Sequence, residues 1–140
     1  MYIFDTDHFS VLERGGGSAE KLIRRLGSLD DPELAVTIIT YQEQIQGRLA
    51  YLNQAKNISQ QVTAYNHLKN QLANYCKIPI LDFDDSAAIE FHILKKKYRR
   101  IGTMDLKIAA IALSINAILL TRNNKDFGQI ENLKIADWTQ

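Results

Sequence analysis

Four carboxylates of this chain stand at the end of an apolar run or near the start of a helix-like segment: Asp5, Glu43, Asp105 and Asp126. Carboxylates brought close together repel one another, which raises at least one pKa unless a cation offsets the charge. Mg²⁺ takes oxygen ligands and keeps several waters, so it suits a small set of Asp and Glu side chains. These residue types predict a Mg²⁺ site, which Mn²⁺ also suits, provided that the fold brings the four acids together.

Further polar side chains lie near these acids in the sequence: Thr6, Asp7, Thr40, Thr121 and Asn123. Hydroxyl groups in such places can donate to a carboxylate or to a phosphate oxygen, and donors of this kind orient metal ligands. The structural explanation of these threonines, as residues that end strands or cap helices, is equally good. The three histidines, His8, His67 and His92, fall on different predicted elements without a repeating spacing. They therefore predict no histidine metal site, and a lone histidine on a helix is more often structural.

The elements that must position these residues follow from the apolar pattern. Short runs of strand-forming residues occur at residues 2–4, 34–36, 78–81, 118–120 and 133–136. Apolar residues at helical spacing predict helices at residues 8–14, 18–27, 41–52, 56–75, 85–94 and 105–115. Strands that alternate with helices predict an α/β fold, with a mostly parallel sheet of four to five strands covered by helices on both faces. The helices at 41–52 and 56–75 would form a helical hairpin.

The carboxyl ends of such strands are where ligands bind in open α/β sheets, and the four acids are expected at that edge. Each acid also has a purely structural explanation. Asp5 could cap the helix that follows it, and Thr40 with Glu43 has the spacing of a capping box. Asp105 is favoured by the dipole of its helix, and Asp126 could be an ordinary loop residue. None of these explanations accounts for the four acids falling at one edge of the sheet.

Length and composition limit the remaining possibilities. A chain of 140 residues with 46% hydrophobic content predicts one domain over residues 1–140. Its 17 basic and 16 acidic residues nearly cancel, so a surface for nucleic acid must be local. The candidates for RNA contact, which equally suit a solvated helix end, are Lys96, Lys97, Arg99 and Arg100. A single cysteine, no secretory signal pattern and no long apolar stretch predict a soluble cytoplasmic protein without a membrane span.

At the residues that end these strands, the chain resembles PIN domains, and among them the VapC toxins of bacterial toxin–antitoxin pairs. The matching segments are IFDTD at residues 3–7, Glu43, GTMDLKIAA at residues 102–110, LTRNNKDF at residues 120–127, and residues 133–138 with their final Asp-Trp. Two positions depart from the pattern. The family often has Asn at position 7, and many members have Asp at position 123. Asp7 thus adds an acid to the pocket, and Asp126 completes the site only if its loop turns inward.

The resemblance implies a PIN-like fold and Mg²⁺-dependent endonucleolytic cleavage of RNA, of tRNA or another structured RNA. Asp5, Glu43, Asp105 and Asp126 would be the catalytic metal ligands. The metal would lower the pKa of a water and orient it for in-line attack on phosphorus, leaving a 5′-phosphate and a 3′-hydroxyl. The resemblance also implies a homodimer and a VapB-like antitoxin protein as partner.

Two other functions fit parts of the sequence. Asp5 and Asp7 after an apolar strand also resemble the start of haloacid-dehalogenase-type phosphatases, in which Asp5 would be a covalent nucleophile and Asp7 the acid and base. Phe9, and the lack of an evident lysine and later acidic pair, count against this alternative. A PIN-like module that binds protein or RNA without catalysis is the second alternative, because Asn123 replaces an acid.

Overall fold

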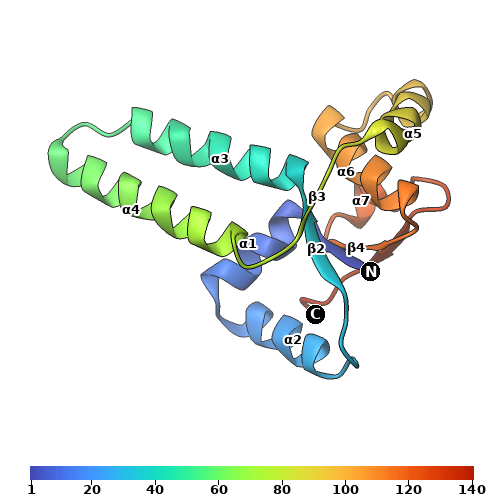
Figure 1. The fold of residues 1–140 in the computed structure, drawn as a ribbon, viewed down its shortest axis with the longest axis horizontal. Helices are drawn as coiled ribbons and strands as arrows, with labels where there is room; N and C mark the ends of the chain where they lie inside the picture. Colours follow the sequence, from blue (N-terminus) through green and yellow to red (C-terminus); the bar gives the residue numbers. More distant parts are fainter.

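Five parallel strands form one sheet in the computed structural model, which describes residues 1–140, in the order β3-β2-β1-β4-β5 (Figure 1). The strands are β1 (Tyr2–Phe4), β2 (Leu34–Thr37), β3 (Ile80–Leu81), β4 (Ile118–Leu120) and β5 (Lys134–Ala136). Every pairing is parallel, and Tyr2 lies beside both Leu34 and Ile118. The predicted α/β fold is confirmed, and Asp5 follows its central strand.

Each face of the sheet has its own apolar core, because successive side chains of a strand point to opposite faces. Ile3 and Leu119 belong to the core under α5 (Asp85–Lys97) and α6 (Thr103–Ser114). Phe4 and Leu120 belong to the core on the opposite face, where α1 (Thr6–Arg14) and α2 (Gly17–Gly27) pack. Helices therefore cover both faces, as the sequence predicts.

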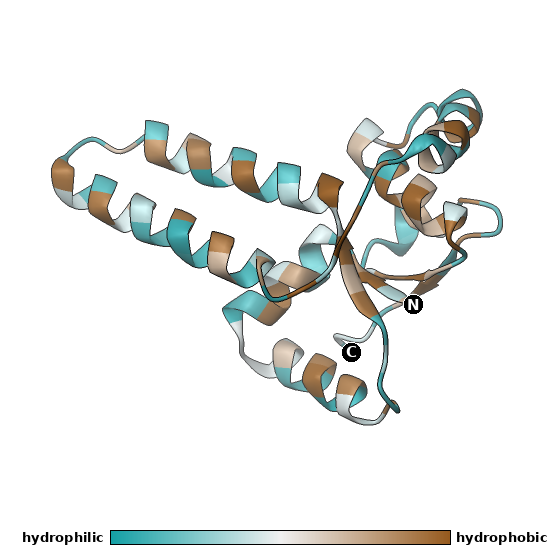
Figure 2. Ribbon diagram, in the orientation of Figure 1, coloured by the Kyte–Doolittle hydropathy of each residue, from teal (hydrophilic) through white to brown (hydrophobic).

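Helix α6 is buried along most of its length, in agreement with its apolar sequence. Figure 2 shows the brown colour of apolar residues on this helix. Its buried residues are Leu106, Ile108, Ala109, Ala110, Ile111 and Ala112. Their burial makes α6 a firm support for Asp105, which lies in its first turn.

The predicted hairpin is formed by α3 (Ile38–Asn53) and α4 (Ile58–Tyr75), which project from the sheet as a pair (Figure 1). Its base is tied to α1 through polar side chains. The Gln71 amide donates to Gln44 at 2.9 Å, and the Gln44 amide donates to the Ser10 hydroxyl at 2.8 Å. None of the chain's helices combines the length and apolarity needed to span a membrane.

Helix α3 begins at Ile38, three residues before the predicted start, because Thr37 caps it. The Thr37 hydroxyl accepts the backbone N–H of Thr40 at 3.1 Å. The capping box of Thr40 with Glu43 is therefore wrong, and the Glu43 carboxylate accepts from Thr6 instead. This difference leaves Glu43 free to face the neighbouring helix α1.

Two further differences affect candidate residues. Helix α5 continues to Lys97, beyond the predicted end at residue 94, so the start of the basic run belongs to the helix itself. A short helix, α7 (Asn124–Phe127), occupies the expected loop after β4 and includes Asp126. It packs tightly at its end, since a Cβ at Gly128 would overlap the backbone oxygen of Asn124.

Candidate active site

Asp5 is both a helix cap and a buried carboxylate. Its side chain is almost inaccessible to solvent, with 5% of the residue exposed. Oδ1 accepts the backbone N–H of His8 at 2.7 Å, and Oδ2 accepts the Thr121 hydroxyl at 2.5 Å. Burial raises the pKa of Asp5 to about 6, repulsion by Asp7 and Asp105 acts in the same direction, and the two hydrogen bonds oppose the rise. The capping explanation is therefore confirmed for this residue, and its role as a metal ligand stays a prediction.

Glu43 reaches the site from α3 and is held by a row of hydroxyl groups. The Thr6 hydroxyl donates to Glu43 Oε1 at 2.8 Å. Thr6 Oγ1 lies 3.1 Å from Thr40 Oγ1, which in turn accepts the Thr37 hydroxyl at 3.4 Å. The end of β2 and the start of α1 thus fix the Glu43 carboxylate together.

Asp105 and Asp126 come from α6 and α7. Burial raises the pKa of Asp105, and repulsion by Glu43 and Asp126 adds to the rise. Asp126 is held by Asn123, whose amide donates to Asp126 Oδ2 at 3.2 Å and whose Oδ1 accepts the Asp126 backbone N–H at 3.2 Å. Asn123 therefore caps α7 and holds the Asp126 carboxylate against the start of that helix.

Electrostatic repulsion connects the four predicted carboxylates through Asp105. The charge of Asp105 raises the pKa of Asp5, and the charges of Glu43 and Asp126 raise the pKa of Asp105. As the side chains stand, no three acidic, histidine or cysteine groups lie close enough together to hold one metal ion. The donor chemistry nevertheless fits Mg²⁺, because the groups are all oxygen ligands whose negative charges a divalent cation would offset. The predicted acids are thus near enough to repel one another, but their side chains are too far apart in this structure to bind one metal ion together.

Asp7 differs from these acids because Arg122 engages it at the surface. Arg122 donates from Nη2 to Asp7 Oδ1 at 2.9 Å and from Nε to Oδ2 at 2.5 Å. The side chains of Asp7 and Arg122 are 45% and 42% exposed. The hydrogen bond from Arg122 lowers the pKa of Asp7, despite a smaller opposing effect of burial. The structure therefore does not direct this predicted residue toward a shared metal position.

His8 is a buried group for which the sequence predicted no functional role. Its side chain is fully buried on the first turn of α1, and Nε2 accepts the backbone N–H of Trp138 at 3.2 Å. Nδ1 lies 3.6 Å from Asp5 Oδ1. Burial lowers the pKa of His8, against the attraction of Asp137 and Asp7. The signal available in the sequence was its spacing, three residues after Asp5 and hence near the same helix end.

The basic run is partly engaged within the chain. Lys97 Nζ pairs with Glu131 at 2.6 Å, and the Tyr98 hydroxyl accepts the Glu131 backbone N–H at 2.9 Å. Lys96, Arg99 and Arg100 are exposed. These three cations are consequently better placed than Lys97 to meet a phosphate.

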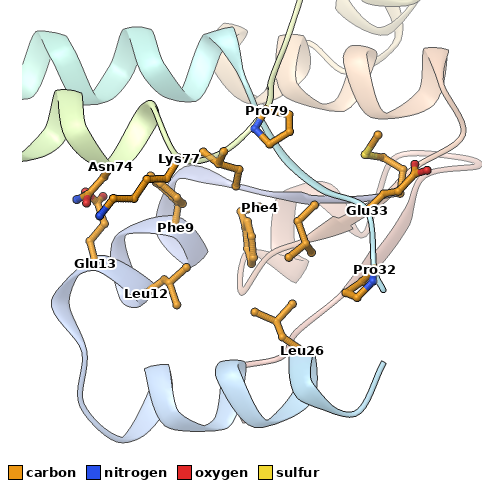
Figure 3. Close-up of a pocket in the computed structure, with 13 residues that line it drawn as sticks. Phe4, Phe9, Leu12, Glu13, Leu26, Pro32, Glu33, Asn74, Lys77 and Pro79 are labelled. Carbon is orange, nitrogen blue, oxygen red and sulfur yellow. The ribbon is translucent and has the colours of Figure 1, made fainter. Parts of the chain in front are cut away.

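An apolar cavity of about 780 Å³ lies apart from the carboxylates, between α1, α2 and the segment after α4 (Figure 3). Phe4, Phe9, Leu12 and Leu26 line it, and none of the four predicted acids does. This hollow suits an apolar group more than a metal or a phosphate.

Comparison with known proteins gives the family. The model of the PIN domain matches residues 2–133. The chain belongs to the PIN-domain family. Ribonuclease VapC1 of Haemophilus influenzae strain R2866 is 33% identical over 146 residues, which span 100% of this chain and 99% of that protein. The predicted resemblance to VapC proteins is thereby confirmed.

Solved structures agree with this assignment of the PIN domain. A chain in the structure of VapBC-1 from nontypeable Haemophilus influenzae is 30% identical, with a TM-score of 0.69 over 99% of this chain and 98% of that chain. A chain of FitAcB from Neisseria gonorrhoeae has a TM-score of 0.71 at 22% identity, over 99% of this chain and 98% of that one. The second likeness concerns the fold alone.

Proposed function

We propose that this PIN domain is a Mg²⁺-dependent endoribonuclease and the toxin of a toxin–antitoxin pair. The observation that best supports the proposal is the buried Asp5 carboxylate directly after the central strand, with Asp105 near enough to repel it and with Glu43 and Asp126 near enough to repel Asp105. The ribonuclease name of the Haemophilus relative supports RNA as the substrate. Selectivity for tRNA or another structured RNA, and a 5′-phosphate and 3′-hydroxyl at the cut, stay predictions.

In this proposal Asp5, Glu43, Asp105 and Asp126 hold Mg²⁺ or Mn²⁺, and neighbouring side chains orient each carboxylate. Thr121 and the His8 backbone hold Asp5, and Thr6 and Asn123 hold Glu43 and Asp126. When bound, the metal supplies positive charge at the scissile phosphate and lowers the pKa of water. In this proposal the cation draws the four carboxylates together, and these hydrogen bonds keep each carboxylate oriented toward it.

Arg99 and Arg100 follow α5 and precede α6, whose first turn contains Asp105. We propose that they and Lys96 bind the RNA backbone, because exposed cations near a cleavage site attract phosphates. The double reversal Arg99→Glu and Arg100→Glu should weaken RNA binding and reduce its dependence on salt concentration. Lys21→Glu, a reversal on α2, is the matched control and should change RNA binding less; equal losses would contradict the assignment.

Phosphatase chemistry of the haloacid-dehalogenase type is less well supported. It needs Asp7 as acid and base beside Asp5, whereas Arg122 engages the Asp7 carboxylate and lowers its pKa. A carboxylate kept ionised in this way is a poor proton donor at neutral pH. A non-catalytic binding module remains the alternative that an activity measurement must decide.

The test of the proposed function is incubation of bacterial total RNA with the protein and Mg²⁺, followed by mapping of the cut ends. Asp5→Asn keeps a side chain that caps helices well but removes the charge. Because metal charge is worth several kcal/mol at a transition state, cleavage should fall by about 100-fold or more. Asp30→Asn, which neutralises an exposed acid, should cleave like the wild type. Mg²⁺ binding without any RNA cleavage by the wild type would favour the non-catalytic module.

We further propose that a VapB-like antitoxin inserts an apolar side chain into the cavity lined by Phe9, Leu12 and Leu26. The VapBC-1 name of the similar structure supports a two-protein complex. Leu12→Glu should prevent co-purification with a co-expressed VapB-like protein while RNA cleavage in vitro persists. Undiminished co-purification would place the contact elsewhere. A homodimer and a cytoplasmic location stay predictions for this chain.

A further inference from the structure

His8 connects the end of the chain to the carboxylate at the end of β1. The residue lies on α1, and its fully buried ring stands between Asp5 on one side and the segment Asp137–Trp138 on the other. Trp138 itself is 6% exposed, and its ring lies 4.8 Å from that of Tyr2, measured between centroids. The segment after β5 is thus packed firmly against β1 and α1.

The hydrogen bond from Trp138 decides which ring nitrogen of His8 has the proton. Nε2 accepts the Trp138 backbone N–H at 3.2 Å, so Nε2 has no hydrogen of its own. A neutral imidazole has one N–H group, which must then be at Nδ1. Nδ1 has no hydrogen-bond partner within 3.5 Å, and it lies 3.6 Å from Asp5 Oδ1. A buried donor without a partner is costly, and this one faces the carboxylate of the candidate site.

We propose that His8 is a positioning residue: its Nδ1–H, fixed by the backbone of Trp138, holds the Asp5 carboxylate in the orientation that binds Mg²⁺. The inference rests on the proposed function and assigns the segment after β5 to the same site. Hydrogen bonds that orient a metal-binding side chain raise its affinity for the metal. Hydrogen bonds in catalytic sites commonly shorten when the substrate binds. The step from 3.6 Å to a hydrogen bond requires only a small movement of the Asp5 side chain.

The tautomer is measured by ¹⁵N NMR on protein labelled at histidine, at neutral pH. The resonances of His8 should show the proton on Nδ1, whereas exposed His92 serves as an internal reference. A proton on Nε2 of His8 would overturn the inference. This measurement does not depend on activity, so it separates the two proposals: a wild type that neither binds Mg²⁺ nor cleaves RNA defeats the proposed function, whatever the tautomer.

Two substitutions then test the consequence for the metal. His8→Phe retains a buried ring without a donor, whereas His8→Asn places an amide N–H near the position of Nδ1. Calorimetric titration with Mg²⁺ should show an affinity about 10- to 100-fold lower for His8→Phe, and most of the affinity should return in His8→Asn. Wild-type affinity in a folded His8→Phe protein, or equal losses in two folded variants, would overturn the inference. If either variant fails to fold, the tautomer in the wild type decides.

The backbone contact has its own pair of variants. Trp138→Pro removes the N–H group that Nε2 accepts, and Trp138→Phe keeps it with an aromatic ring. The Nδ1-protonated tautomer and the Mg²⁺ affinity should both survive in Trp138→Phe and both decline in Trp138→Pro. The same tautomer and affinity in a folded Trp138→Pro protein would show that the segment after β5 does not orient His8.

Discussion

Asp5 and Asp7 are only two residues apart in the sequence, yet they lie in two regions of the site that shift their pKa values in opposite directions. In the floor of the site (Asp5, His8 and Thr121), burial raises the pKa of Asp5 to about 6. At the rim of the site (Asp7 and Arg122), the hydrogen bond from Arg122 lowers the pKa of Asp7. The floor thus contains a carboxylate without a cationic partner, whereas at the rim Arg122 is the cationic partner of Asp7. The comparison teaches that position relative to the strand end, rather than residue type, decides which acid can hold a metal.

The largest expected effect concerns the pH dependence of stability caused by the floor. The pKa of Asp5 rises from 3.8 to about 6 in the folded protein, so folding disfavours its ionised form. The contribution of Asp5 to the free energy of unfolding is fully present below pH 3.8. It is lost as pH rises through about 6, and the total loss is about 3 kcal/mol. Asp5→Asn should lack this loss. Urea unfolding of both proteins between pH 4 and pH 8 in EDTA measures the difference.

A constant difference in unfolding free energy across that pH range would contradict the raised pKa of Asp5. Adding Mg²⁺ at pH 7 should stabilise the wild type more than Asp5→Asn, because a bound cation favours the ionised carboxylate. Equal stabilisation of the two proteins would remove Asp5 from the metal ligands without affecting the pKa result.

An intermediate effect is expected from Thr121, which donates to Asp5 Oδ2 at 2.5 Å. Thr121→Val keeps the shape of the side chain but removes this donor. The Mg²⁺ affinity should fall about 10- to 100-fold, as for other groups that orient metal ligands. Thr121→Ser retains a hydroxyl and should restore most of the affinity. Calorimetric titration measures both variants, and identical values for Val and Ser would mean that the hydroxyl does not orient Asp5.

The smallest effect is expected at the rim. The pair of Asp7 with Arg122 is exposed, and exposed ion pairs contribute about 0–1 kcal/mol. Asp7→Asn should therefore lower the free energy of unfolding by less than about 1 kcal/mol. RNA cleavage should persist, because Asp7 is not among the four proposed metal ligands. A double-mutant cycle with Arg122→Gln measures the coupling energy of the pair. Loss of cleavage comparable to that of Asp5→Asn would erase the distinction between floor and rim.

Most of the fold could be predicted from the chain because its strands are short apolar runs with clear ends. β1 and β4 have the predicted bounds, residues 2–4 and 118–120. The helix starts were harder to predict where polar residues follow one another. Thr37 and Thr40 are both suitable caps, and the end of β2 decides that Thr37 takes this role for α3. Helix α7 has only four residues, too few for an apolar period to show.

The site was predictable in part for the same reason. Asp5 and Thr121 directly follow strands that pair with each other, so the sheet itself brings them into contact. The pairing of Asp7 with Arg122 joins residues 115 positions apart on exposed surfaces, and no periodic pattern specifies it. The contact of His8 with Trp138, 130 positions apart, depends on how the segment after β5 packs.

The sequence by itself determined which residue types are available: acids and hydroxyls after apolar strands, an apolar helix before β4, and the family they resemble. These are local properties, because strand and helix periods are written in neighbouring residues. Only the tertiary structure decided which of two aspartates is buried beside a neutral histidine and which is neutralised by an arginine. Burial and charge pairing depend on every segment packed around a group, so the chemistry of Asp5 and Asp7 emerges only once the sheet, α1 and the end of the chain are assembled.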